Sequence, residues 1–228
     1  MTEQLYILNI ETSGLACTVS LSVDGKHQHL VESKGEWKHS RELTLLVQSI
    51  LEQAELQMSQ LSAIAVSSGP GSYTGLRVGL SAAKAMCYAL DKPLIAIPTL
   101  KIIANAKKSS LNSFDYIIAS IDARRDEIYY QVFNKRFEAL DEADNLILEE
   151  NSFKEYEKAL FCGDAADKAS KLIKTHPSID FDHFRPSAEF MADLAFAKFR
   201  SGSFEDLAYF SPFYLKSPNI TKSKKPLF

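Results

Sequence analysis

The sequence has few cysteines and no long hydrophobic run. Cys17, Cys87 and Cys162 lie far apart, are odd in number and lack CxxC spacing, so we expect buried thiols in a reducing compartment. No stretch approaches the roughly 18 apolar residues of a membrane-spanning helix. The first apolar run contains Asn9 and Glu11 and has no basic region ahead of it. These features predict a cytoplasmic protein that makes no membrane contact.

An excess of charge of one sign is also lacking. The 26 Lys and Arg residues oppose 29 Asp and Glu residues, which leaves a net charge of -3. This balance excludes a whole-surface attraction to nucleic acid. Hydrophobic residues make up 46% of the 228 residues, which is enough for the core of one large domain or two small lobes and excludes disorder as the main state.

The hydrophobic pattern of the first half predicts a mixed sheet covered by helices. A buried apolar run, a segment that alternates with period two and a third strand predict a meander, with Asp24-Gly25 as a hairpin turn. A period of 3.6 then predicts two helices, each followed by a short buried strand. The expected strands are 5–11, 16–23, 27–33, 63–66 and 94–97, and the expected helices are 40–55 and 75–90.

The second half repeats this order. A strand at 116–122 ends on Asp122 as the first strand ends on Glu11, and 127–133 alternates like the second strand. A strand at 160–162 and helices ending near 174 and 199 follow, the last one capped by Ser187. We expect an N-terminal lobe at 1–105, a C-terminal lobe at 106–207 and an arm at 208–228. This α/β organisation resembles the two-lobed actin, sugar-kinase and Hsp70 superfamily (ribonuclease H-like), whose two acid-bearing turns hold metal–nucleotide phosphates.

A glycine-rich segment, SSGPGSYTGLRVG at 67–79, follows a predicted strand and opens a helix. Backbone N–H groups at such a helix start favour an anion, which makes Gly69, Gly71 and Ser72 candidate ligand-binding residues. The segment is not a P-loop, because no Gly-Lys-Ser/Thr follows, and its GxGxxxG spacing is not that of a dinucleotide site. A tight turn with close helix packing is the alternative interpretation.

The two acid-bearing turns differ in chemistry. Glu11, Thr12 and Ser13 could bind phosphate through a carboxylate, hydroxyls and amides. The matching turn of the second half, DARRD at 122–126, places bulky arginines where a phosphate-binding hairpin needs glycine. We therefore interpret these acid turns as a vestigial ligand site and Asp122 with its arginines as a structural ion-pair cluster.

The helix at 75–90 is rich in small residues and has no broad charged face. A helix that is apolar on more than one side packs on more than one side, here against its own sheet and against another subunit. Leu45 lies off the apolar stripe of the preceding helix and is available to the same neighbour. The candidate partner-binding residues are Leu45, Gly75, Leu76, Gly79, Ala82, Ala83, Ala85 and Met86.

No metal site or nucleophile stands out. A second histidine at position 43 would make an HxxxH pair with His39, but Leu43 stands there. No Ser-His-acid arrangement is evident. We expect no catalytic or metal-binding residue in this chain.

Several segments together resemble the bacterial TsaB (YeaZ) family. They occur in the family's order and span nearly the whole chain, and SGPGSYTGLRVG is the most specific of them. The segments are ILNIETS at 7–13, SGPGSYTGLRVG at 68–79, IPTL at 97–100, IDARRDEIY at 121–129 and PFYLK at 212–216.

The resemblance implies a non-catalytic dimerisation or scaffold subunit of the complex that forms N6-threonylcarbamoyladenosine at position 37 of ANN-decoding tRNAs. Such a subunit binds and activates the catalytic paralogue TsaD, which carries the metal site, and the small ATPase TsaE completes the set. It implies a homodimer for the chain alone, tRNA contact through the complex, and ATP and a metal ion in the partner subunits. An ATP-dependent small-molecule kinase or a glycoprotease-like peptidase of the same superfamily is the alternative.

The arm is basic and extended. Lys216, Lys222, Lys224 and Lys225 face no acid within it. Because phosphate contacts dominate nucleic-acid affinity, we expect weak tRNA binding by the free chain, concentrated in this arm.

Overall fold

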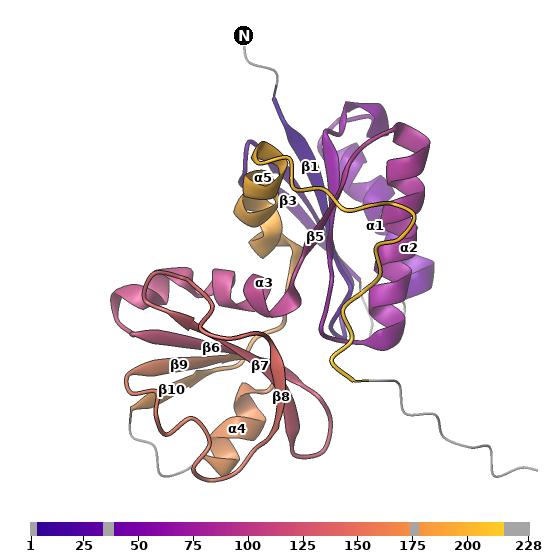
Figure 1. The fold of residues 1–228 in the computed structure, drawn as a ribbon. Helices are drawn as coiled ribbons and strands as arrows, with labels where there is room; N and C mark the ends of the chain where they lie inside the picture. Colours follow the sequence, from indigo (N-terminus) through magenta and orange to yellow (C-terminus); the bar gives the residue numbers. More distant parts are fainter. Residues whose placement is uncertain (1–3, 34–38, 174–177, 217–228) are drawn as a thin grey trace, which may run out of the picture.

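The computed structural model describes residues 4–33, 39–173 and 178–216, without the side chains of 39–41. The described chain forms two lobes, each built on a five-stranded sheet (Figure 1). The first lobe contains β1 (Tyr6–Glu11), β2 (Thr18–Val23), β3 (Lys26–Glu32), α1 (His39–Gln53), η1 (Met58–Gln60), β4 (Ala63–Ser67), α2 (Tyr73–Leu90) and β5 (Leu94–Ile97). After α3 (Thr99–Ala106) and η2 (Lys108–Asn112) come β6 (Tyr116–Asp122), β7 (Glu127–Asn134), β8 (Asp144–Ile147), β9 (Ala159–Gly163), α4 (Ala166–Leu172), β10 (Ile179–Asp182), η3 (Ala188–Met191) and α5 (Ala192–Arg200).

The two sheets have the same connectivity. The first has the order β3-β2-β1-β4-β5 and the second the order β10-β9-β6-β7-β8, which is the same arrangement read from the other edge. In each sheet the opening meander is antiparallel and the strands beyond it are parallel to the first strand. The predicted repeat is therefore confirmed, and Glu11 and Asp122 end equivalent strands.

Pleat alternation gives the first sheet two apolar faces. Leu8 and Ile10 of β1 face α1 and α2, whereas Ile7 faces η3 and α5. Hydroxyls on β2 hold the second layer in place, since Ser20 Oγ donates to the Ala188 carbonyl and Thr18 Oγ1 accepts the Ala188 amide. Figure 1 shows these helix layers on opposite sides of the sheet.

Helix α3 lies between the two lobes (Figure 1). Its Leu100 and Ile103 belong to the core under β6, whereas Ile102 packs with the outer face of the first sheet. The opposite face of the second sheet is covered by α4, whose Ala166 and Ala169 are buried. One helix thus contributes to both lobes.

The structure corrects three expectations about organisation. The segment 188–207, expected in the C-terminal lobe, returns to the first sheet, where Ala188 and Ala195 are buried against β1 and β5. Ser187 precedes η3 but its side chain makes no capping hydrogen bond. The sequence analysis also missed β8, β10 and α3 as elements. Short amphipathic segments carry too little periodicity to show which face of which sheet they cover.

Within the described residues, no helix combines the length and apolar character needed to span a bilayer.

Candidate functional site

Helix α2 begins against the turn that follows β1. A Cβ atom at Gly75 would lie 2.0 Å from the Thr12 carbonyl oxygen, and one at Gly79 would lie 2.2 Å from Thr12 Oγ1. These glycines, with the buried Leu76 and Ala83, face the interior of their own lobe. The expectation that these four residues contact a partner is therefore corrected: the close approach is made to the chain's own turn.

The acid of this turn is enclosed. Glu11 and Thr12 have no exposed surface and Ser13 is 3% exposed. Glu11 Oε1 accepts the Ser13 amide and hydroxyl, each at 2.5 Å, while Glu11 Oε2 and Thr12 Oγ1 have no hydrogen-bond partner among the described residues. Burial raises the pKa of the Glu11 carboxyl above its ordinary value, although hydrogen bonds from Ser13 oppose the shift. These three candidate ligand residues thus lie beneath α2 with almost no surface to offer a ligand.

The glycine-rich loop is also used by the chain itself. Ser72 caps α2, with its Oγ accepting the Gly75 amide at 3.2 Å, and its own amide donates to the Ser13 carbonyl at 2.7 Å. A Cβ at Gly71 would lie 2.7 Å from Ser13 Cβ, and one at Gly69 would lie 2.3 Å from the Phe213 carbonyl oxygen. The geometry favours the packing interpretation of this loop over an open anion cradle.

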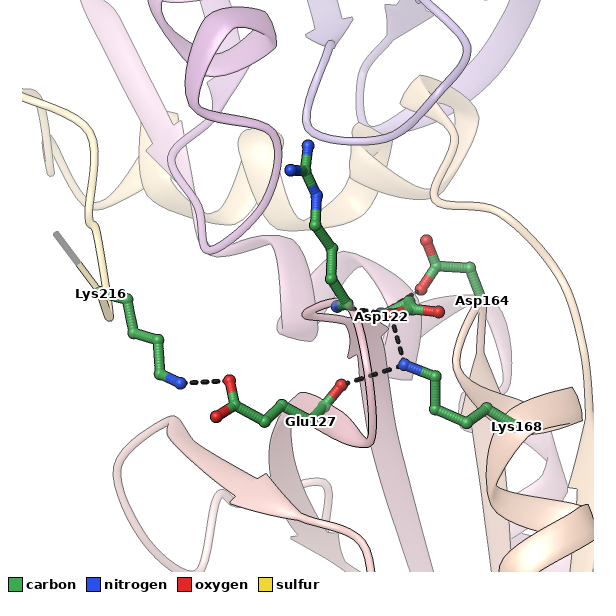
Figure 2. Close-up of polar contacts among 6 residues, drawn as sticks. Asp122, Glu127, Asp164, Lys168 and Lys216 are labelled. Atoms are coloured by element: carbon green, nitrogen blue, oxygen red, sulfur yellow. Dashed lines mark hydrogen bonds and ion pairs between the residues drawn. The ribbon is translucent and has the colours of Figure 1, made fainter. Parts of the chain in front are cut away.

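The acid of the second lobe lies in a polar network, shown in Figure 2. Asp122 Oδ1 accepts the Arg124 amide at 2.6 Å and the Lys168 ammonium at 2.5 Å. The Asp122 amide donates to Asp164 Oδ1 at 2.7 Å. Burial raises the pKa of the Asp164 carboxyl. Lys168 also donates to the Glu127 carbonyl at 3.2 Å, so one ammonium joins β6, β7 and α4.

The arginines of this turn do not belong to that network. Arg124 and Arg125 have φ values of 73° and 51°, in the left-handed region, and both side chains are exposed. Neither side chain makes a hydrogen bond or ion pair with a described residue. The predicted ion-pair cluster is therefore corrected, because the partner of Asp122 is Lys168, which the sequence analysis did not identify.

A surface formed by α1 and α2 exposes apolar groups. On α1, Leu45 is 63% exposed. On α2, Tyr88 is 84% exposed and Ala85 is also exposed. Ala82 and Met86 are partly buried against the core of the lobe. We call Leu45, Ala82, Ala85, Met86 and Tyr88 the α1–α2 face. An open groove of about 370 Å³ runs beside it, lined by Leu43, Thr44, Arg77, Val78, Ser81 and Ala82.

Tyr88 was missed by the sequence analysis. The sequence pattern could have identified this residue, because Ser81, Ala85 and Tyr88 follow one another at helical spacing and lie on the exposed side of α2. An aromatic ring at the end of a row of small residues indicates a contact surface more strongly than the small residues alone.

The C-terminal arm lies along α2, as Figure 1 shows. The Lys84 ammonium donates to the Phe210 carbonyl at 2.7 Å, and Arg77 Nε donates to the Tyr214 hydroxyl at 3.2 Å. Lys216 then pairs with Glu127 of the second lobe. The arm therefore connects α2 to the acid network of Figure 2. The expected basic residues beyond Lys216 lie outside the described residues.

The cysteines and histidines form no reactive centre within 4–33, 39–173 and 178–216. All three cysteines are buried, and burial raises the pKa of Cys17 and Cys87 to about 12. No three His, Cys, Asp or Glu side chains among these residues gather as a metal site would require. Leu43 is 2% exposed and packs in the core of the first lobe, while the side chain of His39 lies outside the described part.

Comparisons with known proteins show which family the chain resembles in sequence. The family model described as TsaD, tRNA N6-adenosine threonylcarbamoyltransferase, matches residues 33–223. The tRNA threonylcarbamoyladenosine biosynthesis protein TsaB of Haemophilus influenzae is 34% identical over 128 residues, which are 56% of this chain and 53% of that protein. The TsaB protein of Bacillus subtilis is 36% identical over 114 residues, 48% of each chain. The aligned part of this chain thus spans about half the length of the curated relatives it matches.

Similarity of fold extends further than similarity of sequence. A crystal structure from Pseudomonas aeruginosa, titled as an uncharacterized protein with similarity to peptidase YEAZ, superposes with a TM-score of 0.78 at 22% identity. The superposition covers 93% of this chain and 100% of that one. The two-lobed α/β fold expected from the sequence is therefore confirmed. The chain belongs to the family whose model is described as tRNA N6-adenosine threonylcarbamoyltransferase (TsaD), and it is similar to TsaB proteins in part of its sequence and to a YeaZ-like protein in its fold.

Proposed function

We propose that this chain is a non-catalytic subunit of the assembly that forms N6-threonylcarbamoyladenosine at position 37 of ANN-decoding tRNAs. Its task in this proposal is to bind and activate a catalytic paralogue of the TsaD type through the α1–α2 face. The match of the TsaD family model and the names of the curated TsaB relatives support the pathway.

The observation that carries the proposal is the exposure of the α1–α2 face. Leu45 and Tyr88 are the two most exposed large hydrophobic side chains of the α1–α2 layer, and Ala85 lies one turn of α2 before Tyr88. Apolar groups gathered beside a groove are typical of a protein–protein contact. A paralogue with the same fold would present an equivalent pair of helices, and two such pairs can pack as a four-helix contact. The same argument predicts a homodimer for the chain alone.

The non-catalytic part of the proposal is supported by the two acid turns. Glu11 lies beneath α2, and Asp122 is held by Lys168 and the Arg124 amide. The Glu11 carboxyl has no exposed surface, and the Asp122 carboxylate, although exposed, is already paired. We therefore assign ATP, the metal ion and the transfer step to the partner subunits, TsaD and the ATPase TsaE.

Substitution of Ala85 by glutamate tests the contact. A carboxylate at this position would be desolvated without a partner, at a cost of about 3 kcal/mol, which corresponds to at least about 100-fold weaker association. The matched control is Ala197→Glu, an exposed alanine on α5. Sedimentation of both variants with and without a TsaD homologue measures the effect, and circular dichroism checks the fold. Equal association of Ala85→Glu and Ala197→Glu would place the contact elsewhere.

Catalysis is tested with the pure chain. We expect no transfer of the threonylcarbamoyl group to tRNA without the paralogue, and activity when the paralogue and TsaE are added. Turnover by the chain alone that is lost in Asp122→Asn would overturn the non-catalytic assignment.

A further inference from the structure

The turn between β6 and β7 carries backbone strain that formation of the turn does not require. Arg124 and Arg125 are consecutive non-glycine residues at positive φ, 73° and 51°, a conformation that is unfavourable for any residue with a Cβ. The same chain uses Asp24-Gly25, with φ values of 49° and 79°, for its β2–β3 hairpin. A sequence of that kind would form the β6–β7 turn with less strain. We therefore infer that the two arginines are present for what their side chains bind and not for the shape of the turn.

The charges of these arginines are not neutralised within the turn. Asp122 pairs with Lys168 and Glu127 pairs with Lys216, so these two carboxylates are engaged elsewhere. Asp126 is the remaining exposed acid of the turn, so one negative charge is available for two arginines. An anion that contacts both guanidinium groups would neutralise charges that no described side chain pairs.

A third arginine, Arg77, lies at the start of α2 and contacts the arm that continues to the second lobe. The Arg77 guanidinium is 4.0 Å from the centre of the Tyr73 ring, and the Tyr73 and Tyr214 rings are 4.7 Å apart. Tyr214 precedes Lys216 by two residues, so their Cα atoms are at most roughly 7 Å apart, and this short piece of the arm carries both the Arg77 contact and the Glu127 contact. We call Arg77, Arg124 and Arg125 the arginine strip. It follows the arm from the first lobe to the second.

From this arrangement, and resting on the function proposed above, we propose that the arginine strip binds the phosphate backbone of the substrate tRNA. Arginines that bind phosphates, next to partly exposed tyrosines such as Tyr73 and Tyr214, form a typical RNA-binding surface. Arg124 and Arg125 also lie just beyond the carboxyl end of β6, and in open α/β sheets ligands bind at that edge. The overall charge of -3 explains why such a contact must be local.

The decisive variant is Arg124→Gly/Arg125→Gly. Glycine relieves the strain at positive φ, so this variant should melt at or above the wild-type temperature while it loses two phosphate contacts. The matched control is Arg136→Ala/Arg200→Ala, which removes two exposed arginines from other parts of the surface. Arg77→Gln tests the first-lobe end of the strip.

The measurement is the affinity of the assembled complex of this chain and a TsaD homologue for an unmodified ANN-decoding tRNA transcript, over a range of salt concentrations. For the glycine variant we expect about 10-fold weaker binding. We also expect the slope of the logarithm of the association constant against the logarithm of the salt concentration to become shallower by about two units, one for each phosphate contact. Arg77→Gln should lose about one unit, and the control should bind like the wild type.

Three outcomes overturn the inference. If the glycine variant and the control bind tRNA equally, the strip is not an RNA contact, while the proposed function stands. If the glycine variant instead fails to associate with the TsaD homologue, the strip is a protein contact. If the wild-type chain forms no complex with the homologue, the proposed function fails and the inference fails with it.

Discussion

Glu11 and Asp122 end equivalent strands of the two sheets, yet their surroundings are opposite. Glu11 has no exposed surface and no cationic partner among the described residues, and it accepts hydrogen bonds from Ser13. Asp122 is exposed and pairs with Lys168. The sequence places an acid at the end of each strand, but whether that acid is enclosed or exposed and paired depends on the elements that pack over it.

The buried carboxyl of Glu11 predicts a specific dependence of stability on pH. Its pKa is raised in the folded state above the ordinary value of 4.5, so the folded chain favours the protonated form. Its favourable contribution is present below pH 4.5 and is lost as the pH rises through the raised pKa, at about 1.4 kcal/mol per pH unit between the two pKa values. The difference in unfolding free energy between Glu11→Gln and the wild type should therefore grow from pH 4 to pH 7.

Urea denaturation at a series of pH values measures this difference. Glu150→Gln, at an exposed site, is the control and should show a difference that does not vary with pH. A constant difference for Glu11→Gln would contradict the assignment of a buried carboxyl with a raised pKa.

At the scale of elements, α2 combines two surfaces with different requirements. Its inner side carries Gly75 and Gly79, which allow the helix to lie directly on Thr12. Its outer side carries Ala85 and Tyr88, which are exposed. The sequence analysis recognised that the helix is apolar on more than one side but assigned its inner glycines to the partner contact.

Substitution of Gly79 by alanine separates these two roles. In an exposed helix this change stabilises by about 1 kcal/mol. Here the new Cβ would lie 2.2 Å from Thr12 Oγ1, so we expect a destabilisation of about 2 kcal/mol instead. Thermal and urea unfolding measure the change, with the exposed Ser81→Ala as a control in the same helix. Recovery of part of the loss by a second change, Thr12→Ala, would identify the clash as the cause, and a stabilised Gly79→Ala would refute it.

At the scale of the whole molecule, the chain crosses between the lobes more than once. Helix α3 contributes Ile102 to the first lobe and Ile103 to the second. The segment 188–200 returns from the second lobe to the first sheet, and the arm returns to the second lobe through Lys216 and Glu127. The two lobes are repeats in topology but are not independent in packing.

This sharing predicts cooperative unfolding. We expect one calorimetric transition for the whole chain, and we expect Ile102→Ala and Ile103→Ala each to lower its midpoint through a loss of about 2 to 4 kcal/mol. The exposed Leu140→Ala should leave the midpoint nearly unchanged. Two separate transitions, with Ile103→Ala affecting one of them alone, would show that the lobes unfold independently.

Local patterns in the sequence determined much of this protein. Apolar runs that end on an acid predicted β1 and β6, period-two alternation predicted β2 and β7, the period of 3.6 predicted α1 and α2, and Asp24-Gly25 marked its hairpin turn. These signals depend on residues close together in the chain, which is why they could be recognised. The tertiary structure alone decided that α5 covers the first sheet, that Lys168 pairs with Asp122, and that Arg124 and Arg125 have no ion-pair partner in the described part of the chain. Each of these depends on contacts between residues distant in sequence, and a single sequence does not encode such contacts in any local period or spacing.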